Sequence, residues 1–161
     1  MNACAYIGLG ANLGDARQTI HDALAALHAS PGVLHCKCSS LYTSDPVEAT
    51  GPIFINAVAR IQTTLAPLNL LDTLQAIEQR HGRERPYRNA PRTLDLDLLW
   101  YDAIHIDTPR LTLPHPRMHQ RAFVLLPLKE IAPDLQLAQG SLKALLETCS
   151  DQGIWLLQDE V

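Results

Sequence analysis

The spacing of apolar residues along the chain predicts both strands and helices. A short apolar run over residues 4–10 and partial alternation over residues 54–62 are typical of buried strands. Apolar residues recur at helical spacing over residues 15–30 and again from Pro67 to just before Gly82, so each segment is predicted to form an amphipathic helix. The other expected elements are a strand at 33–42, loops at 45–52 and 83–92, a short hairpin at 103–108, an irregular connector at 109–116 and a helix at 118–127.

A strand beginning near residue 93 has two chemically different faces, because side chains on a strand alternate between its sides. The two faces would carry Thr93, Asp95 and Asp97 on one side and Leu94, Leu96 and Leu98 on the other. The leucine face predicts contact with a hydrophobic core. The acidic face predicts contact with water or with a cation, since neighbouring carboxylates repel each other.

The order strand, helix, strand, strand, helix, strand predicts an α+β fold. In a ferredoxin-like arrangement this order gives an antiparallel sheet with helices packed on one face. A doubly wound parallel sheet is the second choice, because it needs strands and helices to alternate throughout the chain. We expect a single domain over residues 1–161 and a monomer.

Composition narrows the possible functions. Hydrophobic residues make up 47% of the 161 residues, and the formal net charge is -4, which is unusual for a general nucleic-acid binder. No long apolar run or signal-peptide pattern stands out, so we expect a soluble cytoplasmic protein that binds no membrane. Cys36 and Cys38 lack a second cysteine pair, and we interpret them as small apolar residues rather than zinc ligands.

The acidic face is a candidate metal site. The Cα atoms of Asp95 and Asp97 would be about 6.6 Å apart along a strand, close enough for both carboxylates to lean toward one divalent ion or a pair of ions. Magnesium typically binds one or two carboxylates together with water and substrate phosphates. The alternative is an edge strand whose acidic face is simply solvated.

Arginines precede this strand in an unusual density, and no lysine accompanies them. Arginine can contact two phosphate oxygens at once, so a cluster beside two carboxylates favours a polyphosphate ligand over surface ion pairs. A phosphoryl-transfer site needs both kinds of charge. The phosphate-binding loop motif with a Gly-Lys-Ser/Thr ending is missing, and we interpret Gly8 and Gly10 as turn residues. The cluster consists of Arg80, Arg83, Arg85, Arg88 and Arg92.

Three further sets of residues are weaker candidates. Gln75 and Glu78 share one side of the second helix, where a solvated surface is the simpler interpretation. His115, between two prolines, could donate a hydrogen bond to a phosphate or could be structural. Aromatic and amide side chains suit a flat heterocycle, although two core phenylalanines are the simpler interpretation of the pattern. These last residues are Phe54, Asn56 and Phe123.

Taken together, these segments resemble the 6-hydroxymethyl-7,8-dihydropterin pyrophosphokinase family. The most specific segment is APRTLDLDLL at residues 90–99, and the similarity extends from about residue 5 to residue 135. The other matching segments are YIGLGANLGD at 6–15, FINA at 54–57, LPHPR at 113–117 and RAFVL at 121–125. The resemblance implies a ferredoxin-like fold and transfer of diphosphate from ATP to the hydroxymethyl group of a reduced pterin, with release of AMP.

The resemblance also implies roles for individual residues, none of which follows from spacing alone. Asp95 and Asp97 would hold two Mg²⁺ ions, and Arg83 and Arg92 would stabilise charge during transfer. The implied ATP contacts are Gln75, Glu78, Arg85, Arg92, Leu98, Arg110, Thr112, His115 and Arg121. The implied pterin contacts are Ser44, Val47, Phe54, Asn56, Asp95 and Phe123, with the two aromatic rings on either side of the pterin.

The chain departs from the family's usual pattern in its loops. Glu48 stands where a glycine is common, Ile53 where an acid is common, and Asn89 where some relatives carry tryptophan. These changes affect loop contacts and leave the acidic pair intact. Two rival functions are an RNA-binding ferredoxin-like module, which net acidity disfavours, and a nucleotidyltransferase, which would release pyrophosphate rather than AMP.

Overall fold

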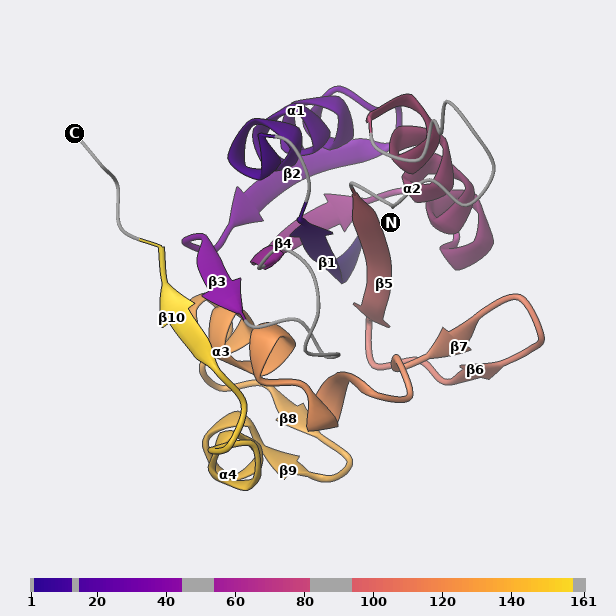
Figure 1. Ribbon diagram of the computed structural model, residues 1–161. Helices are drawn as coiled ribbons and strands as arrows, with labels where there is room; N and C mark the ends of the chain where they lie inside the picture. The colour runs from indigo at the N-terminus through magenta and orange to yellow at the C-terminus, as the bar shows by residue number, and fades with distance from the viewer. Residues whose placement is uncertain (1, 13–14, 45–53, 82–93, 158–161) are drawn as a thin grey trace.

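The structure is a computed structural model, and it describes residues 2–12, 15–44, 54–81 and 94–157. A six-stranded antiparallel sheet forms its centre, with the strand order β10-β3-β4-β1-β5 and with β2 also paired to β4 (Figure 1). The sheet is built from β1 (Ala3–Ala11), β2 (Val33–Cys38), β3 (Tyr42–Ser44), β4 (Phe54–Thr63), β5 (Asp95–Tyr101) and β10 (Ile154–Leu156). The α+β class and the ferredoxin-like antiparallel sheet are as predicted, and four of its strands lie in the order β5-β1-β4-β2.

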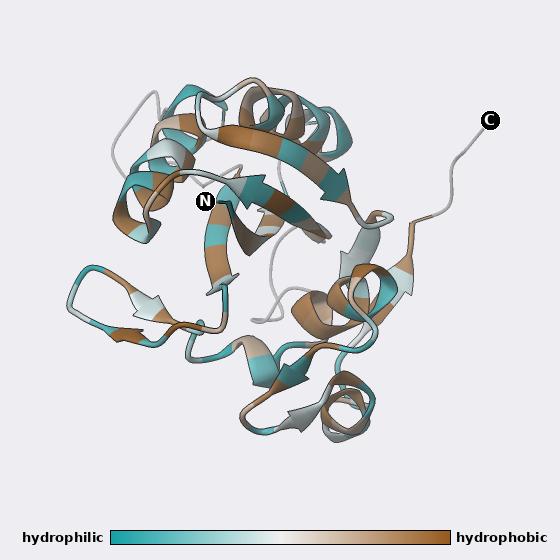
Figure 2. Cartoon of the chain, turned by 180° about the vertical axis from the view of Figure 1, so that it is seen from behind, coloured by the Kyte–Doolittle hydropathy of each residue, from teal (hydrophilic) through white to brown (hydrophobic). Residues whose placement is uncertain are grey.

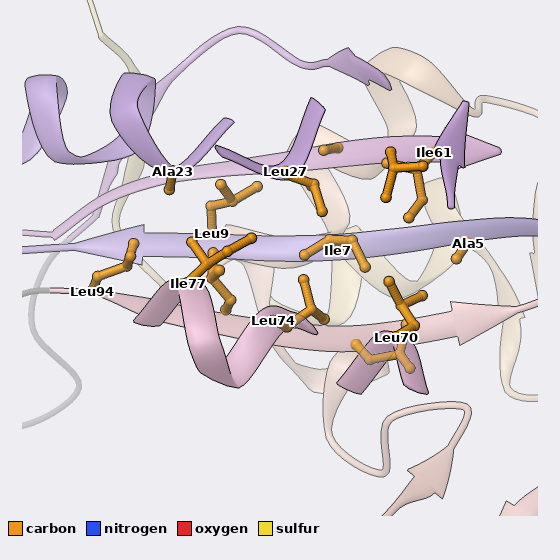
Figure 3. Close-up of a cluster of buried hydrophobic side chains, with 14 of the residues drawn as sticks. Ala5, Ile7, Leu9, Ala23, Leu27, Ile61, Leu70, Leu74, Ile77 and Leu94 are labelled. Carbon is orange, nitrogen blue, oxygen red and sulfur yellow. The ribbon is translucent and has the colours of Figure 1, made fainter. Parts of the chain in front are cut away.

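Two helices cover one face of this sheet. They are α1 (Ala16–His28) and α2 (Pro67–His81), and they begin and end within two residues of the predicted bounds. Asp15 caps α1, because its side chain accepts a hydrogen bond from the Gln18 amide at 3.1 Å. The core between these helices and the sheet contains fully buried leucines and isoleucines from both helices and from the sheet, including Ile7, Leu27, Leu74 and Ile77 (Figure 3).

A further helix packs on the opposite face, which corrects the expectation that all helices lie on one face. α3 (Ala122–Ile131) packs on β4, and α4 (Leu142–Thr148) packs on α3. The sequence of α3 is mostly apolar, and the helix is largely brown in Figure 2. The hydrophobic core between α3 and the sheet includes Val58, Leu99, Leu125 and Leu128. The described part of the fold therefore has three layers, and helices pack on both faces of the sheet.

The predicted strand over residues 33–42 is wrong as a single element, because it divides into β2 and β3. Ser39 and Ser40 separate the two. The Ser39 hydroxyl accepts the Val58 amide at 3.0 Å, and Ser40 donates its amide and its hydroxyl to the Glu130 carboxylate of α3. The Ser39 amide still donates to the Val58 carbonyl at 2.9 Å, but Ser40 bonds to α3 instead of β4, so β2 and β3 pair with different parts of β4.

The C-terminal half also differs in detail from the prediction. The expected helix over residues 118–127 is a short 3-10 turn (Met118–Gln120) followed by α3, because Arg121 between them has an extended backbone. The hairpin expected at 103–108 is longer, since β6 (Ile106–Asp107) pairs with β7 (Thr112–Leu113) inside the predicted connector. A hairpin of β8 (Gln136–Leu137) and β9 (Gly140–Ser141) precedes α4.

All four cysteines are free thiols. Burial raises the pKa of the Cys38 thiol to about 12, so it stays protonated at neutral pH, in agreement with an apolar role. In the described part of the chain, no helix combines the length and the apolar character needed to cross a lipid bilayer.

Candidate active site

Strand β5 separates its leucines from its aspartates, as the alternation predicts. Leu94, Leu96 and Leu98 are buried in the core beneath α1 and α2. Asp95 and Asp97 are half-buried on the opposite side. β5 is the last strand of the sheet and pairs only with β1 among the described strands. The acidic pair therefore lies at the edge of the sheet.

Glu78 of α2 fixes the position of this edge strand. Its side chain is 5% exposed, and its Oε2 atom accepts the Leu96 amide at 2.8 Å. Leu96 lies between the two aspartates, so the bond holds the segment that carries them. The sequence suggested a solvated helix face for Glu78 unless it met a ligand, and the structure instead buries its carboxylate against β5.

A first cavity, of about 220 Å³, opens beside the acidic pair. Its floor is glycine. Gly10 of β1 pairs with Asn56 of β4 on one side and with Asp95 of β5 on the other, and Gly8 pairs with Asp97. Asn56, Gly10 and Asp95 lie side by side on three neighbouring strands, so Asn56 and Asp95 are two strand spacings apart, or about 9.6 Å. Because glycine has no side chain, the space between them is open. A Cβ atom at Gly10 would lie 3.4 Å from the Asn56 Oδ1 atom.

Aromatic and amide groups form the walls of this cavity. Phe54 and Asn56 come from β4, and Phe123 comes from the first turn of α3. Asn56 is 4% exposed, and its Nδ2 atom donates to the Ser44 Oγ atom at 2.6 Å. The Arg121 guanidinium lies over the Phe123 ring, 5.5 Å from its centroid. The cavity thus combines two phenyl rings with a fixed amide and a cation.

A second cavity, of about 340 Å³, lies on the other side of the acidic pair. Asp95 and Asp97 line both cavities, which therefore meet at the two carboxylates. Apolar residues of the second cavity include Leu71 and Leu111, and Arg110 forms an ion pair with Asp72 of α2 at its rim. Its other polar lining comes from Gln75, Glu78, Thr112 and His115.

His115 is a neutral hydrogen-bonding group. Burial, and after it the positive charges of Arg121 and Arg117, together lower the pKa of its imidazole to about 4. Its Nδ1 atom accepts the Arg117 amide at 3.1 Å, and its own amide donates to the Leu99 carbonyl at 2.8 Å. A neutral ring that accepts at Nδ1 carries its proton on Nε2, so His115 can donate one hydrogen bond to a ligand.

The structure brings most of the expected site residues together. Ser44, Phe54, Asn56, Asp95 and Phe123, expected around a pterin, all line the first cavity. Of the residues expected around ATP, the second cavity contains Gln75, Glu78, Leu98, Arg110, Thr112 and His115. Arg121 was expected with them and instead lines the first cavity. Val47, Arg83, Arg85 and Arg92 lie outside the described residues.

Two site residues were misinterpreted in the sequence. Gly8 and Gly10 were assigned to a turn, but they lie inside β1 and form the cavity floor. Their separation by one residue was the available signal, since it places both on one strand face. The turn was the favoured interpretation because glycine is disfavoured in strand interiors, unless a ligand or another backbone must approach closely.

Comparisons with known proteins agree with this arrangement. Residues 6–133 match the family described as 7,8-dihydro-6-hydroxymethylpterin-pyrophosphokinase. A Pseudomonas aeruginosa protein named 2-amino-4-hydroxy-6-hydroxymethyldihydropteridine pyrophosphokinase is 49% identical over 151 residues, covering 92% of this chain and 93% of that protein. A Bacillus subtilis protein of the same name is 44% identical over 137 residues, covering 84% and 82%.

Longer proteins contain a similar segment. The Schizosaccharomyces pombe folic acid synthesis protein fol1 is 37% identical over 158 residues, covering 96% of this chain and 22% of that protein. A crystal structure of a Plasmodium falciparum HPPK-DHPS triple mutant superposes with a TM-score of 0.71 at 15% identity, covering 91% of this chain and 44% of that one. The structural match shows the fold, and the sequence matches show that this chain belongs to the 7,8-dihydro-6-hydroxymethylpterin-pyrophosphokinase family of enzymes.

Proposed function

We propose that this pyrophosphokinase transfers diphosphate from ATP to the hydroxymethyl group of 6-hydroxymethyl-7,8-dihydropterin, with release of AMP, as a Mg²⁺-dependent step of folate biosynthesis. The observation that carries the proposal is that Asp95 and Asp97 line two different cavities. A reaction that joins a group on one ligand to a phosphate on another needs such a meeting point. The two carboxylates lie where the hydroxymethyl oxygen and the triphosphate would come together.

The first cavity suits the pterin. A flat bicyclic ring can lie over the glycine floor between Phe54 and Phe123, and an aromatic ring on each face favours stacking. Asn56 can offer its amide oxygen to ring N–H groups, because the hydrogen bond from its Nδ2 atom to Ser44 fixes the orientation of the amide. Shape and polarity together favour a heterocycle that carries hydrogen-bond donors on one edge.

The second cavity suits the nucleotide. Leu71, Leu98 and Leu111 supply apolar surface for a purine base, and Thr112 supplies polar groups beside it. The Nε2–H group of His115 can donate to a phosphate or ribose oxygen without adding charge. Arg83, Arg85 and Arg92 are proposed to complete the phosphate contacts, and these roles remain predictions from the sequence.

The acidic pair fits magnesium better than it fits a metal held by protein alone. Within the described ranges no cluster of three or more His, Cys, Asp or Glu side chains could hold a metal ion. Two half-buried carboxylates match the usual magnesium site, in which water and substrate phosphates complete the coordination. Asp95 and Asp97 would hold the ions, and the ions would neutralise the triphosphate and polarise the phosphorus that is attacked.

The covered sheet disfavours the RNA-binding alternative. RNA-binding modules of this topology use an exposed sheet face on which aromatic side chains stack bases. Here α3 packs on that face, and Phe54 and Phe123 line a cavity of about 220 Å³. The two phenylalanine rings therefore do not form an open platform on which successive bases could stack.

Product analysis tests the proposed reaction. The enzyme is incubated with ATP, Mg²⁺ and the hydroxymethyl pterin, and nucleotides are separated by chromatography. AMP that forms only when the pterin is present supports diphosphate transfer. ADP would show single phosphoryl transfer instead, and pyrophosphate with a nucleotidylated acceptor would show nucleotidyl transfer, so either product would overturn the proposal.

The acidic pair is tested by isosteric substitution. Asp97→Asn and Asp95→Asn keep the size of each side chain but remove the metal-binding charge, so we expect AMP formation to fall by about 100-fold or more. Asp107→Asn, which changes an exposed acid of β6, is the matched control. Thermal unfolding verifies that each variant is folded. Near-normal turnover of either site variant would contradict the metal role.

A further inference from the structure

The first turn of α3 lacks a cap from its own sequence. Arg121 occupies the N-cap position with an extended backbone, and its side chain makes no capping hydrogen bond. Arginine is a poor N-cap, because it offers donors and no acceptor to the free amides of the first turn. The Arg121 side chain instead points along Phe123 and lines the first cavity.

Gln152, thirty residues further along the chain, supplies the missing cap. Its Oε1 atom accepts the Ala122 amide at 2.8 Å, and its Nε2 atom donates to the Gln120 carbonyl at 2.8 Å. The two bonds fix the backbone on either side of Arg121. Glutamine suits this position, because one side chain must accept and donate at the same time.

Gln152 is itself held in place by the fold. Its backbone amide donates to the Cys149 carbonyl at 2.9 Å, directly after α4. Two residues later the chain enters β10, in which Ile154 pairs with Ser44 of β3. Ser44 in turn pairs with Phe54. The same C-terminal segment thus contacts the element that carries Phe123 and the strand beside Phe54, and Figure 1 shows β10 running along β3.

We propose that Gln152 is a positioning residue for the pterin site, which acts by fixing the backbone that presents Arg121 and Phe123. Without its bonds the Ala122 amide would lose its acceptor, and the first turn of α3 would fray. Phe123 lies in that turn. The proposal rests on the function proposed above for the first cavity. Gln152 also lies beyond the family match, which ends at residue 133.

The test compares two substitutions at Gln152 with a control. Gln152→Met keeps the length of the side chain but makes neither bond, whereas Gln152→Glu keeps the acceptor for the Ala122 amide and loses the donor. Gln136→Met, which changes an exposed glutamine of β8, is the matched control. For each protein we would measure kcat, the KM of the pterin, the KM of ATP, the thermal midpoint and the hydrogen-exchange rate of the Ala122 amide.

We expect Gln152→Met to raise the KM of the pterin by about fivefold to tenfold, the factor that corresponds to the loss of about one hydrogen bond. The KM of ATP should change by less than about twofold, on the same scale of interaction energies. Gln152→Glu should lie between Gln152→Met and the wild type. Exchange of the Ala122 amide should accelerate in Gln152→Met and stay unchanged in the control.

The outcomes separate this inference from the proposed function. If the wild type forms no AMP from ATP and the pterin, the proposed function fails. If the wild type forms AMP and Gln152→Met has a wild-type KM for the pterin, the positioning role is wrong. A lowered thermal midpoint with unchanged kinetic constants would also overturn it, because Gln152 would then serve stability alone. Should Gln152→Met fail to fold, Gln152→Glu provides the same comparison.

Discussion

We predict that lowering the pH reduces the free energy of unfolding through protonation of His115. In the unfolded chain its pKa is near 6.5, whereas in the folded protein burial and the charges of Arg121 and Arg117 lower it to about 4. Between these values the unfolded chain binds a proton that the folded protein does not bind. The stabilising contribution of the neutral imidazole is therefore complete above pH 6.5 and is lost as the pH falls toward 4.

The size of the effect follows from the two pKa values. The difference between 6.5 and about 4 corresponds to about 3 kcal/mol, at about 1.4 kcal/mol for each pH unit. His115 is only half-buried, and solvent screens part of the penalty. We therefore expect the free energy of unfolding to fall by about 1–2 kcal/mol through this group alone.

The assay compares the wild type with His115→Asn by chemical denaturation at pH 7 and at pH 4.5. The asparagine oxygen can accept the Arg117 amide in place of Nδ1, and asparagine does not titrate. Every other titrating group is common to both proteins, so its contribution cancels in the difference. The variant should gain about 1–2 kcal/mol relative to the wild type at the lower pH. A difference that stays constant between the two pH values would refute the reasoning.

Two further predictions concern the junction between β2 and β3 and the floor of the first cavity. Replacing Glu130 with Ala removes the acceptor of Ser40 and of the Tyr42 hydroxyl, 2.6 Å away, so we expect a loss of about 1 kcal/mol in denaturant unfolding; Glu130→Gln should recover part of it. Gly10→Val should fill the hollow beside Asn56 and reduce pterin affinity in calorimetry by at least about tenfold, with stability unchanged or improved, because a β-branched residue suits a strand. Unchanged affinity would mean that no ligand lies over Gly10.

The central elements of the fold could be predicted because their signals are local. β1, α1, β4 and α2 each show the apolar period of the structure they form, and β5 shows it most clearly. The separation of Asp95 and Asp97 from the leucines needs only the alternation of a strand. These parts of the candidate site therefore follow from the sequence alone.

The remaining features depend on contacts between distant residues. β2 ends and β3 begins where Ser40 meets Glu130, ninety residues away, and no local pattern marks that junction. The role of Gly10 depends on its register with Asn56 and Asp95 on two other strands. The C-terminal elements span only two to seven residues each, which is too short for a period to be recognised.

The outermost position of β5 has a consequence for self-association. A strand at the border of a sheet usually offers unpaired amides and carbonyls on which another chain can dock, and proteins guard such borders with charges. Here the Glu78 carboxylate occupies the Leu96 amide, and two acids project nearby from the same strand. The acidic side chains of the candidate active site thus also discourage a second molecule from adding a strand at this edge. Activity and resistance to aggregation therefore favour the same residues.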